Sequence, residues 1–127
     1  MNEVIRIPPA SAGLIAGGSH AVRVGDRVIV SPTNGRGADA KIPKDLEDQT
    51  RACLANVAAV LDQAGSALAQ VVHLQVFLLS PATQELVQRV IAEVLAPTPP
   101  AVTQIGVQSF LDSGRIAIGA EAVVPHP

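Results

Sequence analysis

The side chains that could do chemistry near neutral pH are few: the sequence has three histidines and one cysteine. His20 directly precedes a predicted strand, and its imidazole could serve as a general base or as a donor to a ligand oxyanion. The alternative is a histidine that is merely hydrogen-bonded at the rim of a pocket. Cys53 falls on the apolar stripe of a predicted helix, where a buried, inert thiol is expected. His126 lies in a proline-rich tail, which predicts disorder.

These groups form no recognisable motif for a metal or a nucleotide. The histidines and the cysteine are scattered along the chain, which disfavours a metal site. No Walker or Rossmann glycine pattern follows a predicted strand, and Gly17-Gly18 alone is a weak signal. We therefore expect no metal and no other cofactor.

A helix beginning after Asp45 is the element around which the other segments must be arranged. Asp45 can accept a hydrogen bond from the Asp48 amide as an N-cap, and Gly65 can end the helix in the left-handed conformation. The apolar residues between them recur at helical spacing and predict one buried stripe: Leu46, Cys53, Leu54, Val57, Val60, Leu61 and Ala64.

The remaining elements predict a sheet. Gly25-Asp26 supplies the positive φ of a tight hairpin turn, which Arg23 and Arg27 flank on the polar side. Ser80 and Pro81 are expected to open a second helix, with Ser80 as its cap. The predicted strands cover residues 21–24, 27–31, 71–79, 101–108 and 115–124, the last two joined by a turn around 112–114.

The predicted order β-β-α-β-α-β-β indicates an α+β fold, with a mixed sheet and two helices on one of its faces. The other face is rich in Val and Ile and would be wet in a monomer, so we expect it to pack against further copies of the chain.

Composition limits the classes of function. With 127 residues, we expect a single domain over 1–127. Although 48% of the residues are hydrophobic, no apolar run approaches the roughly 20 residues that a membrane span needs, so we expect no membrane association. The N-terminus lacks a secretory pattern, which favours a cytoplasmic location. A net charge of −2 without a basic block, and two phenylalanines as the only aromatic residues, disfavour nucleic-acid binding.

Several motifs of this sequence resemble the RidA (YjgF/YER057c) family, from about Ala16 to Val124. They are Asp45-Leu46-x-x-Gln49-Thr50-x-x-x-Leu54-x-Asn56-Val57-x-x-Val60-Leu61-x-x-Ala64-Gly65-Ser66, then Val71-Val72 and Val76-Phe77-Leu78, and later Pro99-Pro100-Ala101. The resemblance implies a chorismate-mutase-like fold. It also implies a homotrimer whose sheets line a central barrel, with small-molecule clefts between its subunits.

The best-studied branch of the family hydrolyses reactive enamines and imines such as 2-aminoacrylate to a keto acid and ammonia. This chemistry needs a cation for the substrate carboxylate and a group that positions or activates water. In that branch the cation is an arginine directly after the Pro-Ala pair, and here that position is Val102. The family's last-strand glutamate falls on Ala117, or on Gly119 if the turn contains a one-residue insertion.

Other family positions also differ. The first-strand tyrosine is replaced by Gly18, its neighbouring glutamine by His20, and the asparagine on the second helix by Gln88. The loop that usually reads Ser-Gly-Gln is Ser31-Pro32-Thr33. His73 stands where relatives carry Lys or Arg, which argues for a surface residue.

We expect His20 and Glu121 to be the catalytic candidates. Glu121 could be the displaced acid of the site, or a partner for Arg23 or Arg27 across the barrel. Arg36 could replace the missing arginine, because its loop borders the cleft in relatives; otherwise it is a solvated loop residue. The expected substrate-binding set is Gly18, Thr33, Arg36, Gln88, Val102, Thr103 and Gln104.

Two functions are consistent with this pattern. The first is a divergent RidA-like enzyme, hydrolase- or deaminase-like, acting on a small imine, enamine or carbonyl compound other than 2-aminoacrylate. The alternative is a non-catalytic trimer that binds a small ligand or a partner. Ribonuclease activity, attributed to some relatives, gains no support from charge or aromatic content.

Overall fold

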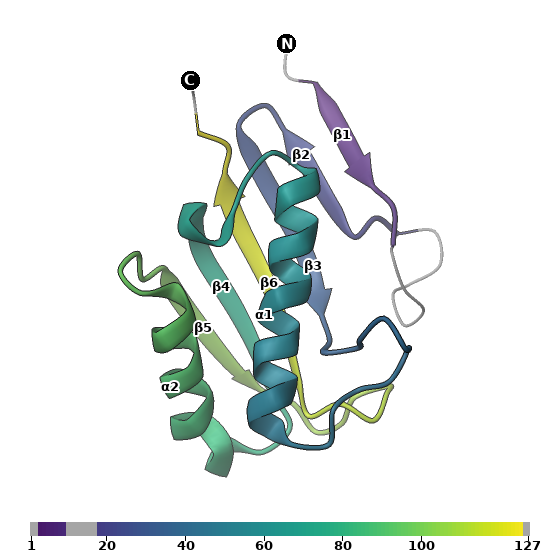
Figure 1. Ribbon diagram of the computed structural model, residues 1–127, viewed down its shortest axis with the longest axis vertical. Coiled ribbons are helices and arrows are strands. Elements are labelled where there is room, and N and C mark those ends of the chain that lie inside the picture. The colour runs from purple at the N-terminus through teal and green to yellow at the C-terminus, as the bar shows by residue number, and fades with distance from the viewer. Residues whose placement is uncertain (1–2, 10–17, 126–127) are drawn as a thin grey trace.

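The computed structural model describes residues 3–9 and 18–125 and contains a six-stranded mixed sheet with two α-helices (Figure 1). The elements are β1 (Val4–Ile7), β2 (Ala21–Val24), β3 (Arg27–Thr33), α1 (Leu46–Gln63), η1 (Leu68–Gln70), β4 (Val71–Leu78), η2 (Pro81–Thr83), α2 (Gln84–Leu95), β5 (Ala101–Gly106) and β6 (Ile116–Val123). The strand order is β1-β2-β3-β6-β4-β5, with β4 and β5 parallel and the other neighbours antiparallel. The predicted α+β fold class is confirmed.

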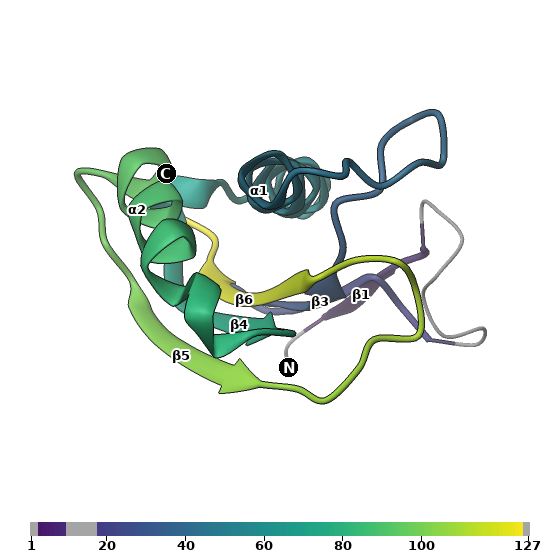
Figure 2. The same ribbon diagram turned by 90° about the horizontal axis from the view of Figure 1, so that it is seen from below.

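Both helices cover the same face of the sheet, as predicted (Figure 2). The core lies between the helices and the sheet and includes Leu54 and Leu61 of α1, Leu74 of β4, and Ile116 and Ile118 of β6. No helix in the described part of the chain is long and apolar enough to cross a membrane.

The opposite sheet face carries exposed apolar side chains. Ile29 alternates with the buried Val28 and Val30 along β3 and is 51% exposed. Ile105 of β5 is aligned with Phe77 of β4 and is 39% exposed. We name this surface the outer face of the sheet.

Helix α1 begins and ends at the predicted residues. Asp45 accepts a hydrogen bond from the Asp48 amide at 3.1 Å. Gly65 has φ +84°, and the amides of Gly65 and Ser66 donate to the carbonyls of Asp62 and Leu61 at 3.1 and 2.8 Å. This pair of bonds is a Schellman motif, which satisfies carbonyls that the helix end would leave free.

The hairpin of β2 and β3 is also confirmed, with Gly25 at φ +60°. The prediction that both arginines lie on its polar side was wrong for Arg23. Its Nη1 donates to Ala64 O at 2.9 Å, which places this side chain on the helix side of the sheet. Arg27 points to the outer face and pairs with Glu121 at 3.2 Å.

Two local features were not predicted correctly. Strand β1 was missed because it has only four residues, is followed by two prolines, and pairs with β2 alone. Ser80 makes no side-chain cap bond. Instead Thr83 Oγ1 donates to Ser80 O at 2.6 Å within the 3₁₀ turn η2, and α2 begins after this turn.

Candidate functional site

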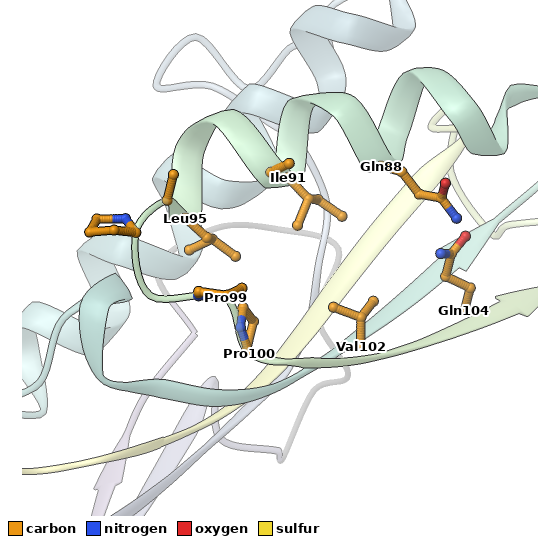
Figure 3. Close-up of a pocket in the computed structure, with 10 residues that line it drawn as sticks. Gln88, Ile91, Leu95, Pro99, Pro100, Val102 and Gln104 are labelled. Atoms are coloured by element: carbon orange, nitrogen blue, oxygen red, sulfur yellow. The ribbon is translucent and has the colours of Figure 1, made fainter.

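A cavity of about 620 Å³ lies between α2 and β5, and we name it the edge cavity (Figure 3). Val102 and Gln104 reach it from the same side of β5, because side chains two apart on a strand share a face. The α2 side chains that line it are spaced at three and four residues and share one helix face. The lining residues are Gln88, Ile91, Ala92, Leu95, Ala96, Pro97, Pro99, Pro100, Val102 and Gln104.

The edge cavity is apolar at one end and carries two amides at the other. In Figure 3 the side chains of Gln88 and Gln104 point toward one another, while Leu95, Pro99 and Pro100 lie at the far end. Gln104 Oε1 is buried and has no hydrogen-bond partner among the described residues. None of the described residues that line it is ionisable. The cavity therefore suits an uncharged ligand that donates a hydrogen bond.

A second cavity, of about 410 Å³, lies between α1 and the loop after β3, and we name it the loop cavity. It brings together three predicted site residues, His20, Thr33 and Arg36, but not Val102. His20 Nε2 lies 3.1 Å from Thr33 Oγ1. Burial of the imidazole lowers the pKa of His20, because the charged form loses hydration. The further lining residues are Gly37, Ala38, Ala40, Asn56, Ala59, Val60 and Gln63.

A third cavity, of about 270 Å³, opens at the outer face and is named the outer cavity. It contains Pro32 and Ala117, two positions that the family resemblance assigns to the cleft. Asp112 also lines it and accepts hydrogen bonds from Asn34 Nδ2 at 3.1 Å and from the Gly114 amide at 2.7 Å. Its remaining lining residues are Asn34, Phe77, Phe110 and Leu111.

Sequence reasoning treated Asp112 only as a turn residue. The Asp-Ser-Gly turn explained its presence fully, so no signal in the sequence pointed to a cavity. Only the structure brings this carboxylate to the cavity that contains Ala117.

The other predicted site residues lie apart from the edge cavity. Thr103 points away from it, since its Oγ1 lies 2.8 Å from His73 Nε2. Glu121 is paired with Arg27, which agrees with the partner role weighed above but occurs within one chain. Gly18 is exposed and lines none of the three cavities. His126 lies outside the described residues.

Within residues 3–9 and 18–125, no three His, Cys, Asp or Glu side chains cluster as metal ligands would. Cys53 is fully buried, and its Sγ lies 3.8 Å from Ile116 O. Burial, with a smaller effect of the Asp112 carboxylate, raises the pKa of its thiol to about 12. This cysteine is therefore not an available nucleophile.

Solved structures of several organisms share this fold. A yeast protein, YEO7, superimposes with a TM-score of 0.89 at 21% identity, over 97% of this chain and 100% of its own. RidA from the Antarctic bacterium Psychrobacter sp. PAMC 21119 gives a TM-score of 0.84 at 24% identity, over 91% of this chain and 93% of its own. These two likenesses show the fold.

The sequence itself assigns the family. Rv2704 from Mycobacterium tuberculosis, described as a member of the YjgF/YER057c/UK114 family, is 28% identical, with a TM-score of 0.82 over 96% of this chain and 100% of its own. Comparison with curated protein sequences gave no match. The family model described as endoribonuclease L-PSP matches residues 11–124. The chain therefore belongs to the endoribonuclease L-PSP family, which includes the YjgF and RidA proteins.

Proposed function

We propose that this protein is a divergent member of the family that hydrolyses a small, uncharged imine, enamine or related carbonyl compound. The observation that carries the proposal is the chemistry of the edge cavity. Val102 stands where the resemblance places the carboxylate-binding arginine, and none of the described residues that line the cavity is a cation. Arg36, the candidate replacement, lines the loop cavity instead. An acidic substrate would meet no counter-charge there, whereas an uncharged one matches the apolar walls.

The proposed site lies between subunits of a homotrimer. Among the positions that the resemblance assigns to one cleft, Val102 and Gln88 line the edge cavity, and Pro32 and Ala117 line the outer cavity. His20, Thr33 and Arg36 line the loop cavity instead. A head-to-tail ring of copies would set the edge cavity of one against the outer cavity of the next. The exposed apolar side chains of the outer face support such association.

Two polar groups could then act on the substrate. Gln104 Oε1 is a free acceptor for the N–H of an imine or enamine. Asp112 lines the outer cavity and is held by a hydrogen bond from Asn34. Its carboxylate would orient water in place of the family's glutamate, whose position is occupied here by Ala117. Water adds to the carbon of the C=N bond, and the resulting carbinolamine releases ammonia to leave a carbonyl group. A cytoplasmic location belongs to the same proposal.

The test is ammonia release from a panel of imines generated in situ, including uncharged aliphatic imines and 2-aminoacrylate. We expect turnover of uncharged imines above the buffer rate, reduced in Gln104→Met and in Asp112→Asn. Arg89→Gln, on the exposed side of α2, is the matched surface control. Rates equal to the buffer rate for every imine would refute the enzyme proposal. A loss of rate in His20→Ala would show that His20 takes part in the reaction, as the sequence analysis expected.

The second candidate is a trimer that binds a ligand without turnover. The absence of an ionisable lining residue from the edge cavity favours it, as do the two hydrogen bonds that already engage Asp112. It predicts saturable binding of an uncharged imine analogue with no ammonia release. The family name refers to a ribonuclease, but the net charge of −2 and the two phenylalanines give such a role no support.

A further inference from the structure

The loop cavity contains a histidine whose tautomer is fixed by its neighbour. Thr33 Oγ1 lies 2.8 Å from Ser31 O, a carbonyl that can only accept, so the hydroxyl proton is directed there. The same oxygen lies 3.1 Å from His20 Nε2. It must therefore accept at this contact, and Nε2 carries the proton.

The other ring nitrogen of His20 is consequently an acceptor without a donor. His20 is 4% exposed, and its Nδ1 is buried with no hydrogen-bond partner in the described part of the chain. Buried polar atoms in proteins are nearly always paired, and an unpaired one costs free energy. Nδ1 is suited to an O–H or N–H group that enters the cavity.

Arg36 lines the same cavity and carries a second unpaired group. Its Nη1 donates to Ala40 O at 2.7 Å, whereas its Nε is buried and has no partner among the described residues. No acidic side chain is among the described residues of its lining, so the guanidinium meets no carboxylate from them. An N–H of a charged guanidinium prefers an anionic oxygen.

The backbone around Arg36 is held in place before any ligand arrives. The Arg36 amide donates to Asn34 Oδ1 at 3.0 Å. Asn56 Nδ2, on α1, donates to the carbonyls of Arg36 and Asn34 at 2.9 and 3.0 Å. Gly35 lies so close to α1 that an added Cβ would meet Gln49 O at 2.8 Å, so the start of this loop packs directly against the helix. A loop fixed in this way loses little entropy when a ligand binds.

We propose that the loop cavity is a second ligand site, separate from the edge cavity, for a small carboxylate that also carries an O–H or N–H donor. The carboxylate accepts from Arg36 Nε, and the donor group binds His20 Nδ1. The volume of about 410 Å³ is ample for a compound of this size. The site does not depend on the proposed hydrolysis, because it shares no lining residue with the edge cavity.

The test compares L-lactate with two compounds of the same carbon skeleton: propionate, which lacks the hydroxyl, and lactamide, which lacks the charge. Binding to the wild-type chain is followed by the ¹⁵N resonances of the histidine rings. We expect L-lactate to shift the Nδ1 resonance of His20 in a saturable manner. Propionate and lactamide should each bind about tenfold more weakly, since each lacks one of the two contacts. L-alanine shows whether an ammonium can replace the hydroxyl.

Arg36→Gln should abolish lactate binding, and Lys41→Gln is the matched control, because it removes one positive charge from the same loop outside the cavity lining. If Arg36→Gln disturbs the fold, Arg36→Lys keeps the charge without Nε and should bind more weakly than wild type. The proposal is overturned if the binding of L-lactate does not saturate, or if propionate binds as tightly as L-lactate. It is also overturned if Arg36→Gln and Lys41→Gln bind L-lactate equally tightly.

Discussion

Arg23 Nη1 donates to Ala64 O at 2.9 Å and joins the β2–β3 hairpin to the C-cap residue of α1, 41 positions away in the sequence. Its Nε also donates to Gly25 O at 2.9 Å inside the hairpin. A cation at the C-terminus of a helix is favourable, because the free carbonyls there carry partial negative charge. This one side chain therefore couples the turn, the sheet and the end of the organising helix.

Replacing Arg23 by Met should lower the free energy of unfolding by about 1–2 kcal/mol, because the two hydrogen bonds and the dipole interaction are lost. The matched control is Arg27→Met, four residues along the same hairpin. The Arg27–Glu121 pair is exposed and should contribute less than about 1 kcal/mol. Urea denaturation of both variants measures the difference. Equal losses would mean that Arg23 acts only as a surface charge.

Burial of Cys53 predicts a loss of stability at alkaline pH. The folded-state pKa of the thiol is raised from 9.0 to about 12, so above pH 9.0 the unfolded chain releases a proton that the folded chain retains. Between these values the free energy of unfolding should fall by up to about 1.4 kcal/mol per pH unit. Cys53→Ala should be less stable at neutral pH but should lack this slope. Denaturation at a series of pH values measures how the free energy of unfolding depends on pH. The prediction is contradicted if the wild type and Cys53→Ala show the same dependence.

The main elements could be predicted because their signals are local. Asp45 and Gly65 mark the ends of α1 by cap chemistry, and Gly25 marks the hairpin by its positive φ. Strand β1 carries too few residues for its alternation to be recognised, and it gains its hydrogen bonds only from β2.

The site was harder to predict because it depends on contacts between distant segments. Val102 and Thr103 were placed together, although strand alternation sends neighbouring side chains to opposite faces. The contact of His20 with Thr33 depends on a stretch of β3 where the register to β6 shifts, and no sequence pattern indicated that shift.

We expect Gln104 to contribute to ligand binding but to lower the stability of the unliganded protein. Its Oε1 is buried without a partner, so Gln104→Met should raise the free energy of unfolding by about 1 kcal/mol, since an unsatisfied buried acceptor is costly. Gln88→Met, at the exposed amide opposite, is the matched control and should change stability little. Thermal and urea denaturation measure the change in stability of both variants. A destabilised Gln104→Met would show that Oε1 already has a partner in solution.

Val102→Arg should move ligand preference toward carboxylates. The new guanidinium would enter the edge cavity, where no acidic lining residue would neutralise it. With Ala117→Glu added, we expect weak 2-aminoacrylate hydrolysis, measured as ammonia release. Val102→Met fills similar space without charge and should keep the preference for uncharged ligands. Equal 2-aminoacrylate rates in the Arg and Met variants would mean that position 102 does not bind the carboxylate.

The trimer should depend on the apolar outer face. Ile29 projects from that face beside the exposed Arg27–Glu121 pair, and a carboxylate buried at this position between subunits would be strongly unfavourable. Sedimentation velocity should therefore give a trimer for the wild type and a monomer for Ile29→Asp, while Ala55→Asp, on the exposed side of α1, stays trimeric. Because the proposed cleft takes Gln104 from one copy and Asp112 from the next, Ile29→Asp should also lose imine hydrolysis. A monomeric wild type, or an active monomeric variant, would show that one chain holds the complete site.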